Sequence, residues 1–261
     1  MATGDAGSLP VAGSPGTCLF CRKPFGPDRP DSREHVWSDW LSREHPGSDI
    51  LPVTSRRTVR GEDDKKRSYS ARPYRYKVSG FCRPCNNGWM SRIDDQVKPW
   101  ALPLIVGRGK ALHETGQCLL SQWAILKTLV ADAAGKAHER VIHQRFYDAL
   151  YAVRDTLEVP ATFEVFVAQF GGGRLDIVHL HSLDDDRPLA RDDIYTASFT
   201  IDRLAFNVFG RDPDGLIEFR HPRIQPAIRR IAPYGGSFVF PPGPALNTHA
   251  LEIFMGTNVL R

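Results

Sequence analysis

The chain has 261 residues, 41% of them hydrophobic and 25% charged, a balance that is typical of a soluble globular protein. Its length allows one large domain or two modest ones, and no apolar run reaches the roughly 18 to 20 residues that a membrane span requires. Its start lacks the basic residues and apolar run of a secretory signal, so we expect a cytoplasmic protein with no membrane partner.

The chain divides into three parts by composition. Residues 1–16 are largely Gly, Ala, Ser and Pro, and we expect a disordered tail because they have little to bury. Residues 17–107 hold four of the five cysteines and are predicted to form a zinc module with a basic insertion at 46–77. Residues 108–261 show helix and strand patterns and are predicted to form an α+β C-terminal domain.

Two Cys-x-x-Cys pairs dominate the first part, namely Cys18 with Cys21 and Cys82 with Cys85. In a chain without an export signal this pattern favours metal ligation over disulfides. Four thiolates suffice for a closed, tetrahedral structural zinc site. The first pair is predicted in a turn and the second at the start of a helix, which is the arrangement of a treble-clef zinc finger. Sixty residues separate the pairs, so the intervening chain must fold or loop out without disturbing them.

A basic segment lies between the two pairs. It carries nine basic and three acidic residues, for a net charge of +6, while the rest of the chain is net −2. The basic residues are Arg56, Arg57, Arg60, Lys65, Lys66, Arg67, Arg72, Arg75 and Lys77. This charge favours a polyanion held near the metal site, and the alternative is a solvated loop that aids solubility. The polar stretch from Pro46 to Ala71 is predicted as an insertion, with a hairpin turning at residues 61–64 as one interpretation.

Apolar residues at helical spacing predict three helices. The first begins after Cys85, where Asn86 or Asn87 can cap it, and ends at Pro99. The others span Gly116–Ala134, which should be largely buried, and about Glu139–Leu157.

Strand-like runs follow the helices. They are residues 162–170, 175–183, 194–201, 204–209 and 216–220. A tight hairpin is predicted at Asp202-Arg203, so the C-terminal region should be a mainly antiparallel sheet backed by two helices. A protein partner or a second copy of the chain could bind through this region.

A Glu-His pair stands between the cysteine pairs, at Glu34 and His35, and an asparagine, Asn86, follows the last cysteine. The order CxxC, Glu-His, CxxCN resembles the HNH endonucleases, the zinc-stabilised branch of the ββα-metal nucleases, over about residues 18–106. The resemblance implies a metal-dependent endonuclease that hydrolyses DNA phosphodiester bonds, with the basic segment gripping the phosphate backbone.

The resemblance also implies roles for these residues. His35 matches the general base that deprotonates the attacking water, and an imidazole has a pKa suited to that task. Glu34 and Asn86 match the ligands of a catalytic cation, and their hard oxygens suit Mg²⁺ or Mn²⁺. From the residues alone two alternatives stay open: Glu34 could pair with Arg33 or Arg43, and Asn86 could serve as a helix cap.

The chain departs from the family pattern at three places, one of which is Gly88-Trp89, where the family often has a Lys. Lys77 stands about where the family has its middle Asn, and Trp37 replaces the Pro that follows the histidine. A second hypothesis is therefore a non-catalytic treble-clef module that binds nucleic acid or protein. A third places the working site in the C-terminal region, with zinc only as an anchor.

Overall fold

The computed structural model describes most of the chain. The described residues are 16–44, 51–58, 65–71, 76–134, 140, 142–172, 176–182, 195–211 and 224–257, with the backbone alone for 51–58, 65–71, 176–182 and 256–257. The predicted tail therefore lies outside the described residues except for its last one, and so does the predicted strand at 216–220.

A pair of antiparallel strands carries the first functional candidates. Strand β1 (Asp31–His35) pairs with β4 (Lys77–Cys82), with a register irregularity between Ser32 and Glu34. β4 leads directly into three helical segments, and a short helix follows β1. The segments after β4 are α2 (Arg83–Cys85), the π-helical turn η2 (Asn86–Met90) and α3 (Ser91–Ile105). The short helix after β1 is α1 (Asp39–Glu44).

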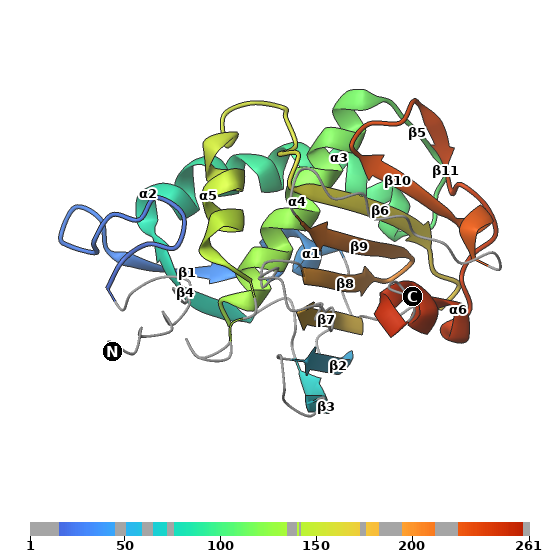
Figure 1. Cartoon of the computed structure of the whole chain (residues 1–261), viewed down its shortest axis with the longest axis horizontal. Helices are drawn as coiled ribbons and strands as arrows, with labels where there is room; N and C mark the ends of the chain where they lie inside the picture. The colour runs from blue at the N-terminus through green and yellow to red at the C-terminus, as the bar shows by residue number, and fades with distance from the viewer. Residues whose placement is uncertain are drawn as a thin grey trace, which may run out of the picture.

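A seven-stranded sheet forms the centre of the molecule, in the order β10-β6-β9-β8-β7-β2-β3 (Figure 1). Its strands are β2 (Leu51–Thr58), β3 (Lys65–Ala71), β6 (Phe163–Gln169), β7 (Asp176–Ser182), β8 (Tyr195–Ile201), β9 (Leu204–Gly210) and β10 (Ile228–Ala232). Every neighbouring pair is antiparallel except β2 with β7. The prediction of a mixed α and β fold with a mainly antiparallel sheet is confirmed.

The basic insertion contributes two strands to this sheet. β2 and β3 form an antiparallel pair in which Arg57 lies opposite Lys65, as a hairpin requires, and β2 continues the sheet by pairing in parallel with β7. The insertion is thus joined through its backbone to strands that come more than one hundred residues later in the chain.

Helix α4 (Glu114–Asp132) lies at the centre of the helical layer and is buried along most of its length, as predicted. It packs against α3, against α5 (Gln144–Ala152) and against strands β6, β9 and β10. The helix predicted at 139–157 is shorter among the described residues, where it ends at Ala152 and Leu157 is exposed. The remaining elements are β5 (Lys110–Leu112) and β11 (Phe238–Phe240), which pair with each other, the 3₁₀ turn η4 (Gln225–Ala227), α6 (Thr248–Glu252) and η5 (Ile253–Thr257).

The prediction that Pro99 ends the helix after Cys85 is wrong, because α3 continues through Pro99 and Pro103 to Ile105. Each proline removes a backbone donor, which costs stability inside a helix. The last turns of α3 nevertheless bury Leu104 and Ile105 completely. The burial of these side chains, at roughly 1.5–3 kcal/mol each, offsets the loss of the backbone bonds.

One hydrophobic core joins residues on both sides of position 107. It includes Leu19 and Phe81 near the cysteines, Trp123 of α4 and Phe199 of β8. A second cluster lies on the other face of the sheet, where Phe254 of η5 packs with Phe166 and Phe209. None of the helices in the described part of the chain is long and apolar enough to cross a membrane.

The contact between α3 and α4 is tight at Gly116. A Cβ atom added there would lie 2.5 Å from Cε3 of Trp100, closer than real contacts allow. We therefore expect Gly116→Ala to lower the free energy of unfolding, since overpacking costs about 1–3 kcal/mol and outweighs the roughly 1 kcal/mol that alanine gains in a helix. Urea denaturation would measure the change. Gly26→Ala, where no atom lies within 4 Å, is the control, and equal midpoints for the two variants would contradict the expectation.

Candidate functional site

The four predicted zinc ligands lie together. The sulfur atoms of Cys18, Cys21, Cys82 and Cys85 are all within 4.8 Å of one another, and no disulfide joins them. The first pair sits on a tight turn in which Arg22 adopts a φ of 58°. The turn is attached to β4 because the Leu19 N–H donates to the Gly80 carbonyl at 2.9 Å. This backbone bond brings the two cysteine pairs together, although sixty residues separate them in the sequence.

The surroundings favour one thiolate in the cluster, that of Cys18, whereas burial raises the pKa of Cys82 and the bond to Cys18 raises the pKa of Cys85. The pKa of Cys18 falls to about 5, chiefly because the Cys85 thiol donates to it, and the backbone N–H of Cys82 also donates to its sulfur at 3.3 Å. Nη1 of Arg29 lies 3.5 Å from the Cys82 sulfur and 3.7 Å from the Cys21 sulfur. Four clustered, partly ionised sulfurs are compatible with a structural zinc ion.

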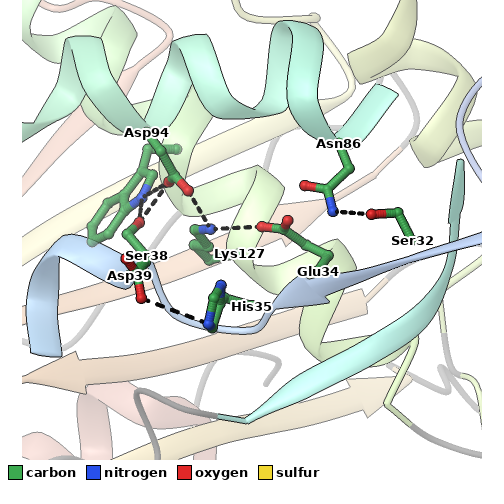
Figure 2. Close-up of polar contacts among 9 residues, drawn as sticks. Ser32, Glu34, His35, Ser38, Asp39, Asn86, Asp94 and Lys127 are labelled. Atoms are coloured by element: carbon green, nitrogen blue, oxygen red, sulfur yellow. Dashed lines mark hydrogen bonds and ion pairs between the residues drawn. The ribbon is translucent and has the colours of Figure 1, made fainter. Parts of the chain in front are cut away.

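The candidate residues Glu34 and Asn86 are drawn in Figure 2, and Asn86 directly follows Cys85 of the cluster in the sequence. Glu34 is buried near the end of β1, and Asn86 follows directly after α2. The Asn86 side chain donates from Nδ2 to Oγ of Ser32 at 2.8 Å. In Figure 2 the Glu34 carboxyl group lies between Lys127 and Asn86, and the amide oxygen of Asn86 is on the side of that carboxyl group. The helical segments after β4 begin at Arg83, three residues before Asn86, so Asn86 does not cap their N-terminus.

His35 lies at the last position of β1 and is partly exposed. Its Nε2 is 3.7 Å from Oδ1 of Asp39 on α1. Burial lowers the pKa of His35, and so does the charge of Lys77, which is its cross-strand partner on β4; the Asp39 carboxylate opposes them. The neutral imidazole is therefore favoured near pH 7. Asp39 was not singled out from the sequence, because its i+4 spacing from His35 indicates a contact only within a helix, and His35 ends a strand.

Lys127 of α4 is the residue that sequence reasoning missed. Its side chain is completely buried, with Nζ 3.0 Å from Oδ2 of Asp94 and 3.4 Å from Oε1 of Glu34. Burial alone would lower the pKa of Lys127, but the Asp94 and Glu34 carboxylates raise it above its usual value. The available signal was its spacing, four residues after Trp123 and three before Val130, which puts a lysine on the buried face of an apolar helix.

The charged partner of Glu34 is Lys127. Arg43, one of the two partners considered from the sequence, pairs with Asp39 at 3.0 Å. Burial raises the pKa of Glu34, and the Lys127 ammonium acts in the opposite direction. Glu34 is thus a buried carboxyl group with one nearby cation rather than a surface ion pair.

The predicted DNA-contacting residues are only partly described. Lys77 is exposed beside His35. Arg56, Arg57, Lys65, Lys66 and Arg67 have a described backbone in β2 and β3, whereas Arg60, Arg72 and Arg75 lie outside the described residues. A cavity of about 450 Å³ runs along β4 and is lined by Lys77, Ser79 and the exposed ring of Tyr76, among others.

No protein-family model, curated protein or solved structure matches this chain.

The cysteine cluster generates a prediction about metal content. We expect the purified protein to carry about one zinc ion per chain, and Cys85→Ser to lose it and unfold the segment around β1 and β4. Structural zinc contributes about 10 kcal/mol or more in zinc-finger peptides, which is comparable to the whole stability of a domain. Elemental analysis and thermal melting would measure both effects. Cys118→Ser, at the cysteine outside the cluster, is the matched control, and retention of zinc by Cys85→Ser would contradict the assignment.

Proposed function

We propose that this chain is a metal-dependent endonuclease of the HNH type that hydrolyses phosphodiester bonds in DNA. The observation that carries the proposal is the position of Asn86, whose side chain bonds to Ser32 two residues before Glu34 and so stands beside the Glu34-His35 pair. On this proposal the β1–β4 pair, the cysteine cluster and the following helix constitute a treble-clef, ββα-metal module with structural zinc.

The charges around Glu34 support a cation site. Glu34 and Asp94 bring two carboxylates to one ammonium, that of Lys127. Buried charge without compensation is costly, so this balance favours a further cation. The carboxylate of Glu34 and the amide oxygen of Asn86 are hard ligands that fit Mg²⁺ or Mn²⁺. When bound, such an ion would stabilise negative charge on the phosphoryl and leaving oxygens.

His35 would act as the general base. Nε2 is the ring nitrogen near Asp39, at 3.7 Å, so on this proposal Nε2 would carry the proton of the neutral ring and Nδ1 would take a proton from the attacking water. Asp39 would stabilise the resulting imidazolium and so take the orienting role that the family gives to an Asn. Lys77, on the neighbouring strand, would hold a phosphate of the substrate.

Plasmid cleavage tests the role of His35. Purified protein is incubated with supercoiled DNA and Mg²⁺ or Mn²⁺, beside His35→Ala and the control His113→Ala, a histidine that bonds to Ser237 far along the chain. We expect His35→Ala to lose about 10²- to 10⁴-fold in rate, the usual contribution of a general base, and His113→Ala to retain activity. Equal rates for the wild type and His35→Ala, or no cleavage by either across several DNA substrates, would refute catalysis by His35.

Lys77 offers a separate test of DNA binding without cleavage. With EDTA present, we expect Lys77→Ala to weaken binding of a labelled duplex and to reduce the slope of log K against log salt by about 0.9, because one phosphate contact is lost. Fluorescence anisotropy at several salt concentrations gives the slope. Lys98→Ala, which removes a lysine paired with Glu44, is the control, and equal slopes for both variants would argue against this contact.

One observation favours the second candidate, a non-catalytic module that binds nucleic acid or protein. Lys127 already faces one oxygen of Glu34, so an ammonium rather than a metal ion could serve as its permanent counter-charge. The two functions differ in the number of metals bound. Titration with Mn²⁺ of the zinc-loaded protein separates them, because only the nuclease requires a second ion at Glu34 and Asn86.

A further inference from the structure

The buried ammonium of Lys127 is costly where it stands. An ammonium fully removed from water loses several kcal/mol of hydration, and an apolar residue of similar size is often no less stabilising. The neighbours of Lys127 on the same helix, Leu126 and Thr128, are also fully buried, so the helix has no need of a lysine to cover solvent-facing surface. A lysine at this position calls for a role beyond packing.

The position of the ammonium is set mainly by Asp94. The Lys127 contact with Asp94, at 3.0 Å, is shorter than its contact with Glu34, at 3.4 Å. Asp94 is itself held, because its Oδ1 accepts from Oγ of Ser38 at 2.5 Å and from Nε1 of Trp123 at 2.9 Å. The ammonium therefore has a fixed place that does not depend on Glu34.

Glu34, in contrast, has one charged partner among the described residues, Lys127, and a bond from the backbone N–H of His35. Its Oε1 faces the ammonium, and Figure 2 shows the carboxyl group oriented so that its other side is toward Asn86. Another buried ion pair of this chain has a different geometry. Glu164 and Arg211 are both buried and meet at 2.8 Å, with Arg230 as a second cation near the same carboxylate.

We propose that Lys127 is a positioning residue of the candidate cation site, which fixes the Glu34 carboxylate so that one oxygen remains directed toward Asn86. The inference rests on the proposed function, since it concerns the same cation. It adds that α4, which lies beyond residue 107 in the sequence, supplies part of a site whose ligands lie before that residue. The zinc-bearing segment alone would therefore lack a component of its own site.

Binding of Mn²⁺ to the full, zinc-loaded chain tests the inference. The variant is Lys127→Met, which keeps the length of the side chain and removes its charge. Outer residues that orient metal ligands typically contribute 10- to 100-fold in affinity, so we expect Mn²⁺ to bind at least about tenfold more weakly. The substitution also removes the repulsion between the Lys127 ammonium and the bound cation, which by itself would strengthen Mn²⁺ binding. A weakened affinity therefore reports the positioning effect.

Gln122→Met is the matched control. Gln122 is a buried polar residue on the same helix, but it donates to the carbonyls of Thr156 and Glu158, away from Glu34. We expect it to bind Mn²⁺ with unchanged affinity. The paramagnetic resonance spectrum of bound Mn²⁺ is the second readout, since a changed Glu34 ligand alters the spectrum at saturation, whereas a general loss of stability does not.

The outcomes separate the two proposals. If the wild type binds no Mn²⁺ beyond its zinc, the proposed cation site itself fails. If it binds Mn²⁺, but Lys127→Met binds as tightly as Gln122→Met or gives the wild-type spectrum, the positioning role is overturned. Zinc content and a cooperative melt report folding of each variant, and Lys127→Gln, whose amide can still donate to Asp94, replaces Lys127→Met if the latter does not fold.

Discussion

The ion pairs of Lys127 join the parts of this molecule on which the candidate site depends. The ammonium lies on α4, and its two carboxylate partners come from β1 and α3. Because a buried charge is strongly destabilising once its partner is removed, the three elements are held in one arrangement. His35 is the last residue of β1, and Asn86 lies in η2, which leads into α3, so their positions depend on the same contact.

The two groups of polar residues offer different donor atoms. The cysteine cluster is soft, partly ionised and surrounded by backbone donors and Arg29, which suits zinc. Glu34 and Asn86 offer hard oxygens in a setting where carboxylates outnumber nearby ammonium groups. β4 connects the two groups, since it ends at Cys82 and begins at Lys77, opposite His35. The cysteine cluster thus lies at one end of β4, and His35 lies opposite the residue at its other end.

The basic insertion is tied to the sheet rather than to the cysteine cluster. β2 pairs with β7, and β3 stands at the end of the strand order, so the hairpin extends the sheet away from β10 (Figure 1). The charge of this segment was evident in the sequence. Its attachment was not, because parallel pairing between residues 54–58 and 176–181 depends on contacts that no local pattern records.

The sequence by itself determined the features that depend on neighbouring residues. The spacing in each cysteine pair predicted the cluster, the apolar spacing along α4 predicted a buried helix, and Asp202, whose φ is 49°, lies in the predicted turn between β8 and β9. The tertiary structure decided what depends on burial and on distant partners. Helix α3 continues through Pro99 because its last turns are packed in the core. Folding places Lys127 next to Glu34, which is 93 residues away in the sequence. A charged residue in an apolar helix can be recognised in the sequence. Its partner depends on the tertiary structure, because only the folded chain removes both groups from water.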